Sequence, residues 1–415
     1  MGCSKNQSLM PIEQALSKMQ SAVSNVCHAI NLPLAQALGY ALATDVLSPL
    51  NVPSFNNSAM DGYAVLKGDL KKASKQSPVS LTLVGQSFAG APYHGKIKSG
   101  ECIRIMTGAV MPKDVDSVVM QERITRHDDR ITFIQTPTLG DNVRLAAEDM
   151  CKGQCVLKKG HKLSVRDIPL LASLGLADIS VFRPLKVAVF SSGDELKNIG
   201  HTLSEGEIYD SNRYSIIALL SRLNVEIIDF GIVKDDRVAI REALLLADQQ
   251  ADVVITSGGV SVGDADFIKE VLIEIGSIVF WKLAIKPGKP FAFGKLTHSV
   301  FFGLPGNPVS AMVTLYQLAV PIMATLAGFD VAPVLRLQAK CSHVVKKSPG
   351  RTDFQRAIYK IDDAGQLIVQ TTGSQGSGVF SSMSQSNCFM VLEAERGDVL
   401  QGEIVIIEPY NALMN

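Results

Sequence analysis

Apolar residues recur at two different spacings along the N-terminal part of the chain. In residues 11–23 they recur every three or four positions, which predicts an amphipathic helix near the start. Between residues 51 and 135 the pattern changes to short apolar runs such as 81–84 and 131–134, separated by Gly, Pro and the polar turn at 127–130. Short runs bounded by turn residues predict a β-rich unit.

From residue 183 onward, apolar runs alternate with stretches of helical spacing. Strands are predicted at 186–190, 226–230, 252–256 and 300–302, with helices at about 216–223, 238–247 and 267–275. This alternation implies a parallel, doubly wound sheet whose ligands bind at the carboxyl ends of the strands. After residue 331 the helical spacing disappears, and alternating stretches at 355–361, 367–370 and 403–407 predict a small β domain.

The changes of pattern predict a multidomain chain of α/β and β parts. Residues 1–52 and 136–182 form a mixed helix and strand domain, 53–135 an inserted β-rich domain, 183–330 the doubly wound α/β domain, and 331–415 a small C-terminal β-barrel-like domain. One stretch, 296–329, has no charged residue and is long enough to span a membrane. Because the Gly-Leu-Pro-Gly-Asn-Pro turn at 303–308 interrupts it, we predict a strand, a turn and a buried helix instead.

Charge and cysteine content limit the possible binding partners and the cellular compartment. The 415 residues carry 40 Lys and Arg against 40 Asp and Glu, so no net field draws the chain to nucleic acid or to a membrane. Aromatic residues make up 6%, which disfavours a surface that stacks on bases. Seven Cys without a paired framework, and no signal peptide, predict reduced thiols in the cytoplasm. No zinc site is expected at Cys151 and Cys155, because no second ligand pair follows.

Three loops that directly follow predicted strands are the first candidates for a site. They span 191–196, 257–266 and 303–310, and all are rich in Gly and small hydroxyl residues. Their backbone N–H groups can approach an anion closely, and Pro308 suits the first turn of a helix whose N-terminus favours phosphate. Any one of them could be an ordinary tight turn. Three such loops on one edge of a sheet favour an anion-binding cleft.

Neither standard nucleotide fingerprint is present. Gly258, Gly259 and Gly263 have the wrong spacing for a dinucleotide loop, and the Gly residues from 288 to 294 do not form a P-loop. The sequence therefore argues against an ordinary dehydrogenase or a P-loop NTPase.

Charged residues gather around the same loops. Lys282, Lys286 and Lys289 lie in a segment stiffened by two prolines, which suits an oxyanion, although a solvated edge is an equal alternative. Acidic pairs lie at 194–195 and 235–236, and Asp264 and Asp266 lie in the second loop. On a phosphate-lined cleft such carboxylates would suit Mg²⁺, whereas any single one of them could simply be an exposed turn residue.

Seven motifs resemble those of the molybdopterin molybdenumtransferase family, which includes the E domain of gephyrin. They span 55–64, 104–108, 191–196, 209–212, 257–263, 285–290 and 303–310, in the family's order. The resemblance implies a molybdopterin-binding α/β domain and a Mg²⁺-dependent insertion of molybdate into adenylylated molybdopterin that releases AMP. It also implies a homodimer with a shared active site, and it allows the molybdopterin adenylyltransferase as a partner. Molybdate and tungstate have nearly the same shape and charge, so the resemblance leaves both open.

The resemblance also assigns residues. It implies a catalytic set of Asp61, Thr107, Asp149, Glu195, Asp235 and Asp266, of which Glu195, Asp235 and Asp266 would hold the metal. The expected substrate-binding residues are Arg144, Ser192, Gly193, Gly258, Gly259, Ser261, Lys282, Lys286, Lys289, Pro305, Gly306, Asn307, Ser310, Arg351 and Ser377. In the implied dimer, Asp61, Thr107, Arg144 and Asp149 of one subunit would face the cleft of the other. One departure lies between Arg144 and Asp149, where Leu145-Ala146-Ala147 replaces an expected basic, Gly-containing run.

Two other functions fit parts of the sequence. The related adenylyltransferase resembles residues 183–330 alone, and a protein-binding scaffold could use the same architecture. The additional domains that carry Asp61 and Thr107 favour the insertion step, and the chain lacks a long linker or a second α/β domain that would favour a scaffold. No motif pairs a nucleophile with a base, so we expect catalysis by positioning and electrostatics.

Overall fold

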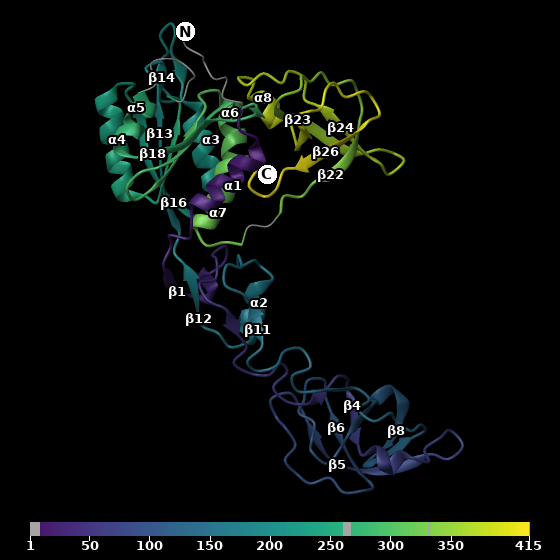
Figure 1. Ribbon diagram of the computed structural model, residues 1–415. Helices are drawn as coiled ribbons and strands as arrows, with labels where there is room; N and C mark the ends of the chain where they lie inside the picture. The colour runs from purple at the N-terminus through teal and green to yellow at the C-terminus, as the bar shows by residue number, and fades with distance from the viewer. Residues whose placement is uncertain (1–8, 260–266, 331–332, 415) are drawn as a thin grey trace. The chain divides into compact units, whose positions relative to one another are not determined.

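The computed structural model describes residues 9–259, 267–330 and 333–414 (Figure 1). The chain divides into two compact units. The first comprises Met1–Ala43, Gly160–Ile168 and Asp178–Asn415, and the second comprises Thr44–Lys159 and Pro169–Ala177. The helix α2 (Asp167–Ser173) runs across the boundary between the two ranges. The four-domain division expected from the sequence is finer than this one and stays a prediction.

A six-stranded sheet forms the centre of the first unit, with the strand order β16-β13-β17-β21-β20-β18. Its strands are β13 (Leu185–Ser192), β16 (Val225–Val233), β17 (Val253–Ser257), β18 (Ser277–Lys282), β20 (Pro290–Lys295) and β21 (Val300–Leu304). Strands β16, β13, β17 and β21 are parallel, and β20 and β18 continue the sheet antiparallel. The predicted doubly wound α/β fold is confirmed, and its four predicted strands are the parallel ones.

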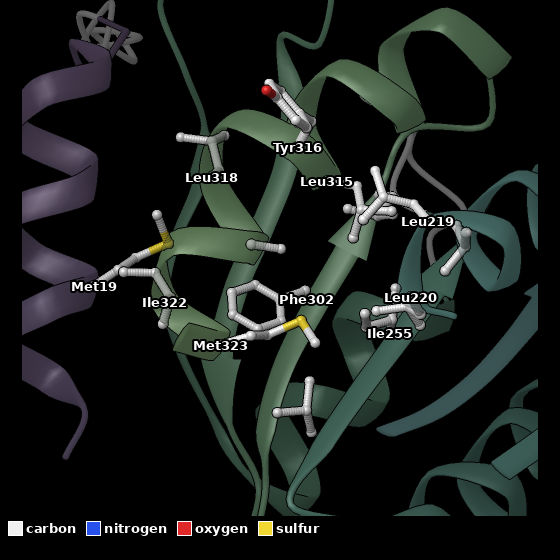
Figure 2. Close-up of a cluster of buried hydrophobic side chains, with 14 of the residues drawn as sticks. Met19, Leu219, Leu220, Ile255, Phe302, Leu315, Tyr316, Leu318, Ile322 and Met323 are labelled. Atoms are coloured by element: carbon white, nitrogen blue, oxygen red, sulfur yellow. The ribbon is translucent and has the colours of Figure 1, made fainter. Parts of the chain in front are cut away.

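Helices cover both faces of this sheet because successive side chains along each strand point to opposite faces. Val187 and Val189 of β13 pack in one cluster with α1 (Ile12–Ala22), α3 (Ser211–Leu220) and the helical segment 308–326. Figure 2 shows this cluster, with Met19 of α1 reaching toward Ile322. The side chains that alternate with them along β13, Ala188 and Phe190, pack against α4 (Arg237–Gln250) and α5 (Phe267–Ile275).

The charge-free stretch forms a strand followed by one long helix, as its turn predicts. After β21, the helix runs from Pro308 to Leu326 as α6 (Pro308–Thr314), a π-helical turn η4 (Leu315–Ala319) and α7 (Val320–Leu326). By length and composition it could cross a membrane, but 72% of its 18-residue apolar stretch is buried inside the protein. The helix is therefore explained as a core helix that packs on the sheet.

The C-terminal part of the first unit contains a closed five-stranded barrel. It is built from β22 (Leu337–Cys341), β23 (Thr352–Ile361), β24 (Leu367–Thr371), β25 (Cys388–Leu392) and β26 (Ile404–Pro409). The order β23-β24-β22-β26-β25 closes because β25 also pairs with β23. The predicted small β-barrel-like domain is thus confirmed. The short β19 (Ile285–Lys286) of the Lys-rich segment pairs with β23, and α8 (Ser381–Ser384) precedes β25.

The remaining short strands of the first unit form two small ladders. Strand β1 (Ala29–Pro33) pairs antiparallel with β12 (Asp178–Phe182), and β14 (Leu196–Lys197) pairs parallel with β15 (Ile208–Tyr209). A single 3₁₀ turn, η1 (Leu34–Gln36), follows β1.

The second unit is β-rich, as its short apolar runs predict. Its six-stranded sheet has the order β7-β4-β6-β5-β9-β8. The strands are β4 (Gly62–Val65), β5 (Val79–Ser87), β6 (Glu101–Ile105), β7 (Ser117–Met120), β8 (Ile124–His127) and β9 (Arg130–Phe133). Two small ladders join β3 (Asn57–Ser58) to β10 (Val143–Arg144) and β2 (Val46–Leu47) to β11 (Cys155–Leu157). Two 3₁₀ turns lie at η2 (Lys67–Leu70) and η3 (Gln121–Arg123).

Candidate functional site

A cavity of about 300 Å³ opens at the carboxyl ends of the parallel strands in the first unit. We call it the α/β cleft. It is lined by Ser192, Glu195, Leu196, Ile208, Tyr209, Asp210, Ser211, Asn212, Ser257, Gly258, Gly306, Pro308 and Gly378. Strands β13, β17 and β21 end at or beside these residues, so the described parts of the three loops singled out by composition lie on one edge of the sheet. This is the edge at which doubly wound sheets bind ligands.

The loops of the cleft approach one another too closely for larger residues. A side chain at Gly258 would place its Cβ 2.3 Å from the carbonyl oxygen of Ser192, and Gly258 has a φ of +87°. The amide of Asn212 donates from Nδ2 to the Ser257 hydroxyl at 2.8 Å and to the Gly306 carbonyl at 2.7 Å. Asn212 therefore ties the second loop to the third.

A buried ionic network supports the first loop from behind. Asp210 caps α3 and is 1% exposed, and it accepts hydrogen bonds from the Ser191 hydroxyl and from Arg213 Nε. Arg213 also donates to Asp229 and, at 3.0 Å, to the side chain of Asn198. Charge-assisted bonds in a buried setting hold backbone geometry firmly. The end of β13, where Ser191 leads into the cleft, is fixed in this way.

The acidic residues near the cleft differ in what their carboxylates bond to. Asp236 accepts from the N–H groups of Val238 and Ala239 and caps α4, which lowers its pKa. Asp235 accepts from the Ser192 hydroxyl at 3.1 Å. Glu195 lies beside Gly193, whose added Cβ would fall 2.7 Å from Oε2 of Glu195. Glu195 and Asp235 thus flank the same strand end.

Two members of the predicted set, Ser261 and Asp266, lie outside the described residues. Gly259 precedes that gap and has a φ of +63°. Among the residues with described positions, no group of three or more His, Cys, Asp and Glu side chains is arranged to hold a metal ion. Asp266 is not among these residues, so the metal set of Glu195, Asp235 and Asp266 stays a prediction.

The Lys-rich segment joins the α/β sheet to the barrel. Lys282 ends β18, Lys286 lies on β19, and Lys289 precedes β20. Lys286 Nζ lies 3.2 Å from a carboxylate oxygen of Asp353, which is buried on β23. Lys282 and Lys289 are exposed. Of the three cations, only Lys286 makes an ion pair with another described residue.

The third loop and two C-terminal residues complete the predicted set of the first unit. Pro305 and Ser310 are buried, while Gly306 and Asn307 are exposed at the start of α6. The Ser377 carbonyl accepts from the Val309 N–H at 3.1 Å, so the Ser377 segment touches the first turn of α6. Arg351 precedes β23 and is half-buried.

In the second unit, Asp61 and Thr107 form a tight pair. The backbone N–H and the hydroxyl of Thr107 both donate to Oδ1 of Asp61, each at 2.7 Å. These two bonds, the backbone one foremost, lower the pKa of Asp61. The residue after Asp61 is Gly62. A larger residue would not fit there, because its Cβ would lie 2.2 Å from the Val119 carbonyl oxygen. The remaining carboxylate oxygen of Asp61 has no described hydrogen-bond partner in this unit and can serve a ligand.

Arg144 and Asp149 line a separate pocket of about 480 Å³ in the same unit. We call it the Asn57 pocket, lined by Val52, Pro53, Asn57, Arg144, Glu148 and Asp149. The intervening loop turns sharply at Ala147, whose φ is +65°. Positive φ favours glycine, which gives a physical reason for the Gly that the family resemblance leads us to expect in this loop.

Three family models together match most of the chain. "MoeA N-terminal region (domain I and II)" matches residues 10–175, "Probable molybdopterin binding domain" matches 188–325, and "MoeA C-terminal region (domain IV)" matches 338–410. A molybdopterin molybdenumtransferase of Haemophilus influenzae is 48% identical over 98% of this chain and 100% of its own length. One from Nostoc sp. is 35% identical over 89% of this chain and 86% of its own.

The chain belongs to the molybdopterin molybdenumtransferase family. It is an enzyme of that family, as the sequence motifs predict. A crystal structure titled as molybdopterin biosynthesis moeA protein from Pyrococcus horikosii aligns with a TM-score of 0.82 and 30% identity, covering 98% of this chain and 100% of that one. A second, from Pyrococcus horikoshii OT3, aligns with a TM-score of 0.84 and 27% identity over 97% of this chain.

Membership of the family leaves individual residue roles as predictions, and the structure adds residues that the motifs did not single out. Asn212 and Asn57 both stand within quoted family motifs but received no role from the sequence. The two bonds of Asn212 and the missing partner of Asn57 are visible only in three dimensions. Asp353 was missed because nothing in the sequence relates it to Lys286, 67 positions away.

Proposed function

We propose that this chain inserts molybdenum from molybdate into adenylylated molybdopterin, releasing AMP and giving the molybdenum cofactor. Family membership supports molybdenum insertion as the general activity. The observation that carries the finer statement is the α/β cleft, where Ser192, Gly258 and Gly306 meet at the strand ends. Closely packed glycine loops of this kind accommodate phosphate groups through backbone N–H donors.

The two substrates require different kinds of donor. The pyrophosphate of the adenylylated pterin suits the backbone N–H groups of the cleft loops, whose positions are held by Asn212 and Asp210. The tetrahedral oxyanion suits the cations Lys282, Lys286 and Lys289 of the adjoining segment. The proposed division of labour is thus phosphates on backbone groups and molybdate on side-chain ammonium groups.

The carboxylates of the cleft fit a magnesium ion. Mg²⁺ is commonly held by one or two carboxylates together with substrate phosphate oxygens, and Glu195 and Asp235 flank one strand end next to Ser192. When bound, the ion would neutralise part of the phosphate charge. The chain has no net positive charge that could do so. Glu195 and Asp235 would hold it, and the sequence adds Asp266.

The proposal includes a cytoplasmic homodimer in which Asp61, Thr107, Arg144 and Asp149 of one subunit complete the cleft of the other. A molybdopterin adenylyltransferase would supply the substrate. The Asp61–Thr107 pair supports a role outside its own unit's core, because a carboxylate oxygen is left for an external group.

The decisive test is AMP release from adenylylated molybdopterin by the purified full-length protein. We expect release only when molybdate and Mg²⁺ are both present, and we expect chelation to stop it reversibly. Adenylylation of molybdopterin from ATP, measured in parallel, would instead identify an adenylyltransferase. A protein that releases no AMP under any of these conditions would contradict the proposal and would favour a scaffold.

A further inference from the structure

Arg356 is a charged residue buried inside the first unit. It lies on β23 and is 1% exposed, and within the described residues no carboxylate forms an ion pair with it. Burial lowers the pKa of its guanidinium, and a buried charge without a counter-charge destabilises a fold unless hydrogen bonds offset the cost. The hydrogen-bond partners of Arg356 therefore show which part of the structure depends on it.

The side chain of Arg356 is turned away from the core of the barrel. Side chains alternate between the two faces of β23, and Ala357 packs in the barrel core. Phe354 lies on the other face and packs in the cluster that includes Met19 of α1 and Leu219 of α3. Arg356 shares the face of Phe354, so it belongs to the side of the barrel that meets the α/β part of the unit.

The guanidinium of Arg356 holds both ends of a short loop, residues 376–382. Its Nη2 donates to the Gly376 carbonyl at 3.1 Å, and its Nε donates to the Ser382 hydroxyl at 3.0 Å. That hydroxyl donates in turn to the Val379 carbonyl at 2.6 Å. One planar group thus fixes the loop at its beginning and at its end.

The backbone of Arg356 bonds to the residues just before this loop. Its N–H donates to Oε1 of Gln375 at 2.8 Å, and its carbonyl accepts from Nε2 of Gln375 at 3.1 Å. The Thr372 N–H donates to the same carbonyl at 3.0 Å. Because these contacts do not use the side chain, a substitution of Arg356 removes only the bonds of the guanidinium.

The loop that Arg356 holds forms part of the α/β cleft. The Ser377 carbonyl accepts from the Val309 N–H at 3.1 Å, in the first turn of α6. The next residue, Gly378, lines the cleft, and of the described lining residues it is the one that comes from the C-terminal part of the chain. The wall of the cleft on this side therefore depends on the position of the loop.

We propose that Arg356 is a positioning residue, which holds the loop 376–382 against α6 so that the cleft wall is in place before substrate binds. Arg356 itself is too deeply buried to touch a substrate. Arginine suits this role, because its fork donates in two fixed directions and keeps its charge when buried. The identity of the substrate rests on the proposed function. A wall that is already ordered spares the substrate the free-energy cost of ordering it.

The first test measures amide hydrogen exchange in the full-length protein. The N–H groups of Val309, Val379 and Phe380 all donate to carbonyls of the loop. In Arg356→Met their exchange should become at least about tenfold faster, because the loop loses two hydrogen bonds and opens more often. The amides of β17, in the centre of the sheet, should keep their native rates.

Arg336→Met is the matched control. Arg336 also donates from Nε at 3.0 Å, but its partner is the buried Glu408 on β26 and not the loop. This variant should keep native exchange at Val309, Val379 and Phe380. Unchanged exchange in Arg356→Met, or the same increase in Arg336→Met, would overturn the proposal.

Kinetics separates positioning from general stability. Because the loop must then be ordered at each binding event, Arg356→Met should raise KM for adenylylated molybdopterin about tenfold and change kcat less than about threefold. Arg356→Lys keeps the charge but lacks the fork, so it should behave like Arg356→Met. Full recovery by Arg356→Lys, or a lower kcat at native KM, would contradict a positioning role.

Ser382→Ala keeps the proposal testable if Arg356→Met does not fold. It removes only the partner of Nε, so it should increase exchange at Val379 and raise KM in the same direction by a smaller factor. Native exchange and native KM in a folded Ser382→Ala would count against the proposal.

The outcome is distinguishable from that of the proposed function. Normal AMP release by Arg356→Met, with native exchange in the loop, would reject the positioning role and keep molybdenum insertion. Faster exchange confined to Val309 and the loop, in a protein that releases no AMP, would keep the positioning role and reject the insertion activity.

Discussion

The α/β cleft and the Asn57 pocket are lined by similar polar residues, yet they differ in how those side chains are bonded. In the cleft, the polar groups of Asn212 and Asp210 hydrogen-bond to neighbouring loops. In the pocket, Arg144, Asp149 and Oδ1 of Asn57 have no hydrogen bond within the described residues. A cleft that binds through backbone N–H groups therefore uses its side chains to hold the loops in place. A pocket made of side-chain donors must leave them free.

The comparison predicts that substitutions of free groups reduce turnover, whereas substitutions of bonded groups reduce stability. The largest effect is expected at Asp61, which offers one unbonded carboxylate oxygen. Asp61→Ala should lower kcat for AMP release by about 10²–10³-fold, the usual loss when one preorganised electrostatic group is removed. Because the two Thr107 bonds to Oδ1 are lost as well, Asp61→Ala should also unfold at a somewhat lower denaturant concentration, while it stays folded under assay conditions.

Asp69→Ala is the matched control, because Asp69 likewise accepts from a hydroxyl and a backbone N–H, those of Ser99 and Gly100. It should keep normal AMP release. The shared site has its own test: mixed dimers of Asp61→Ala and Glu195→Ala subunits should regain activity in one cleft. Near-normal AMP release by Asp61→Ala, or inactive mixtures after verified subunit exchange, would contradict these expectations.

The second effect concerns molybdate. A charge-assisted hydrogen bond contributes about 1.5–3 kcal/mol, so loss of one Lys should raise the molybdate concentration for half-maximal AMP release about ten- to a hundredfold. Lys289→Ala is the cleaner variant, because Lys289 is exposed and makes no ion pair within the described parts of the chain. Lys286→Ala also strips buried Asp353 of its partner, so it is best combined with Asp353→Asn.

Lys295→Ala serves as the control for both variants, since Lys295 ends β20 opposite the start of β21, away from the strand ends that form the cleft. Direct binding of adenylylated molybdopterin should change less than the molybdate requirement. If the variants lose pterin binding while their molybdate requirement stays unchanged, the Lys-rich segment serves the pterin phosphates instead.

The third effect falls on stability. Asn212→Leu removes two hydrogen bonds, of 2.8 and 2.7 Å, that tie two loops together, so it should lower the free energy of unfolding by about 1–3 kcal/mol. Denaturant titration would measure this. Asn57→Leu should not lower the free energy of unfolding. If both variants lose the same amount, the contrast between bonded and unbonded side chains is wrong.

Sequence patterns predict the fold better than the site, for physical reasons. Strands β13, β17 and β21 are nearly continuous apolar runs and the helix Phe267–Ile275 has helical spacing, so the local pattern is enough to find them. Neither antiparallel strand is predicted. Strand β20 begins with Pro290 and contains Gly294, whereas the four apolar residues of β18 follow the predicted helix 267–275 after Gly276 with no longer turn to separate them. Contacts are harder still, since Asn212 reaches Gly306 across 94 positions. Asp61 was found only by resemblance to a family.

The smallest effect tests the loop that departs from the family pattern. Ala147 adopts a φ of +65°, which costs an L-residue about 1–2 kcal/mol, whereas glycine adopts it freely. Ala147→Gly removes this strain from the folded state. Glycine also gives the unfolded chain more conformational entropy, which costs about 0.5–1 kcal/mol, so the free energy of unfolding should rise by a net of about 0.5–1 kcal/mol. The reciprocal change in the cleft, Gly258→Ala, should be far more damaging, because its Cβ would lie 2.3 Å from the Ser192 carbonyl oxygen. The denaturant midpoints of both variants, at unchanged slopes, measure these differences. If Ala147→Gly is less stable than the native chain, contacts of the alanine methyl group must outweigh the backbone strain in this loop.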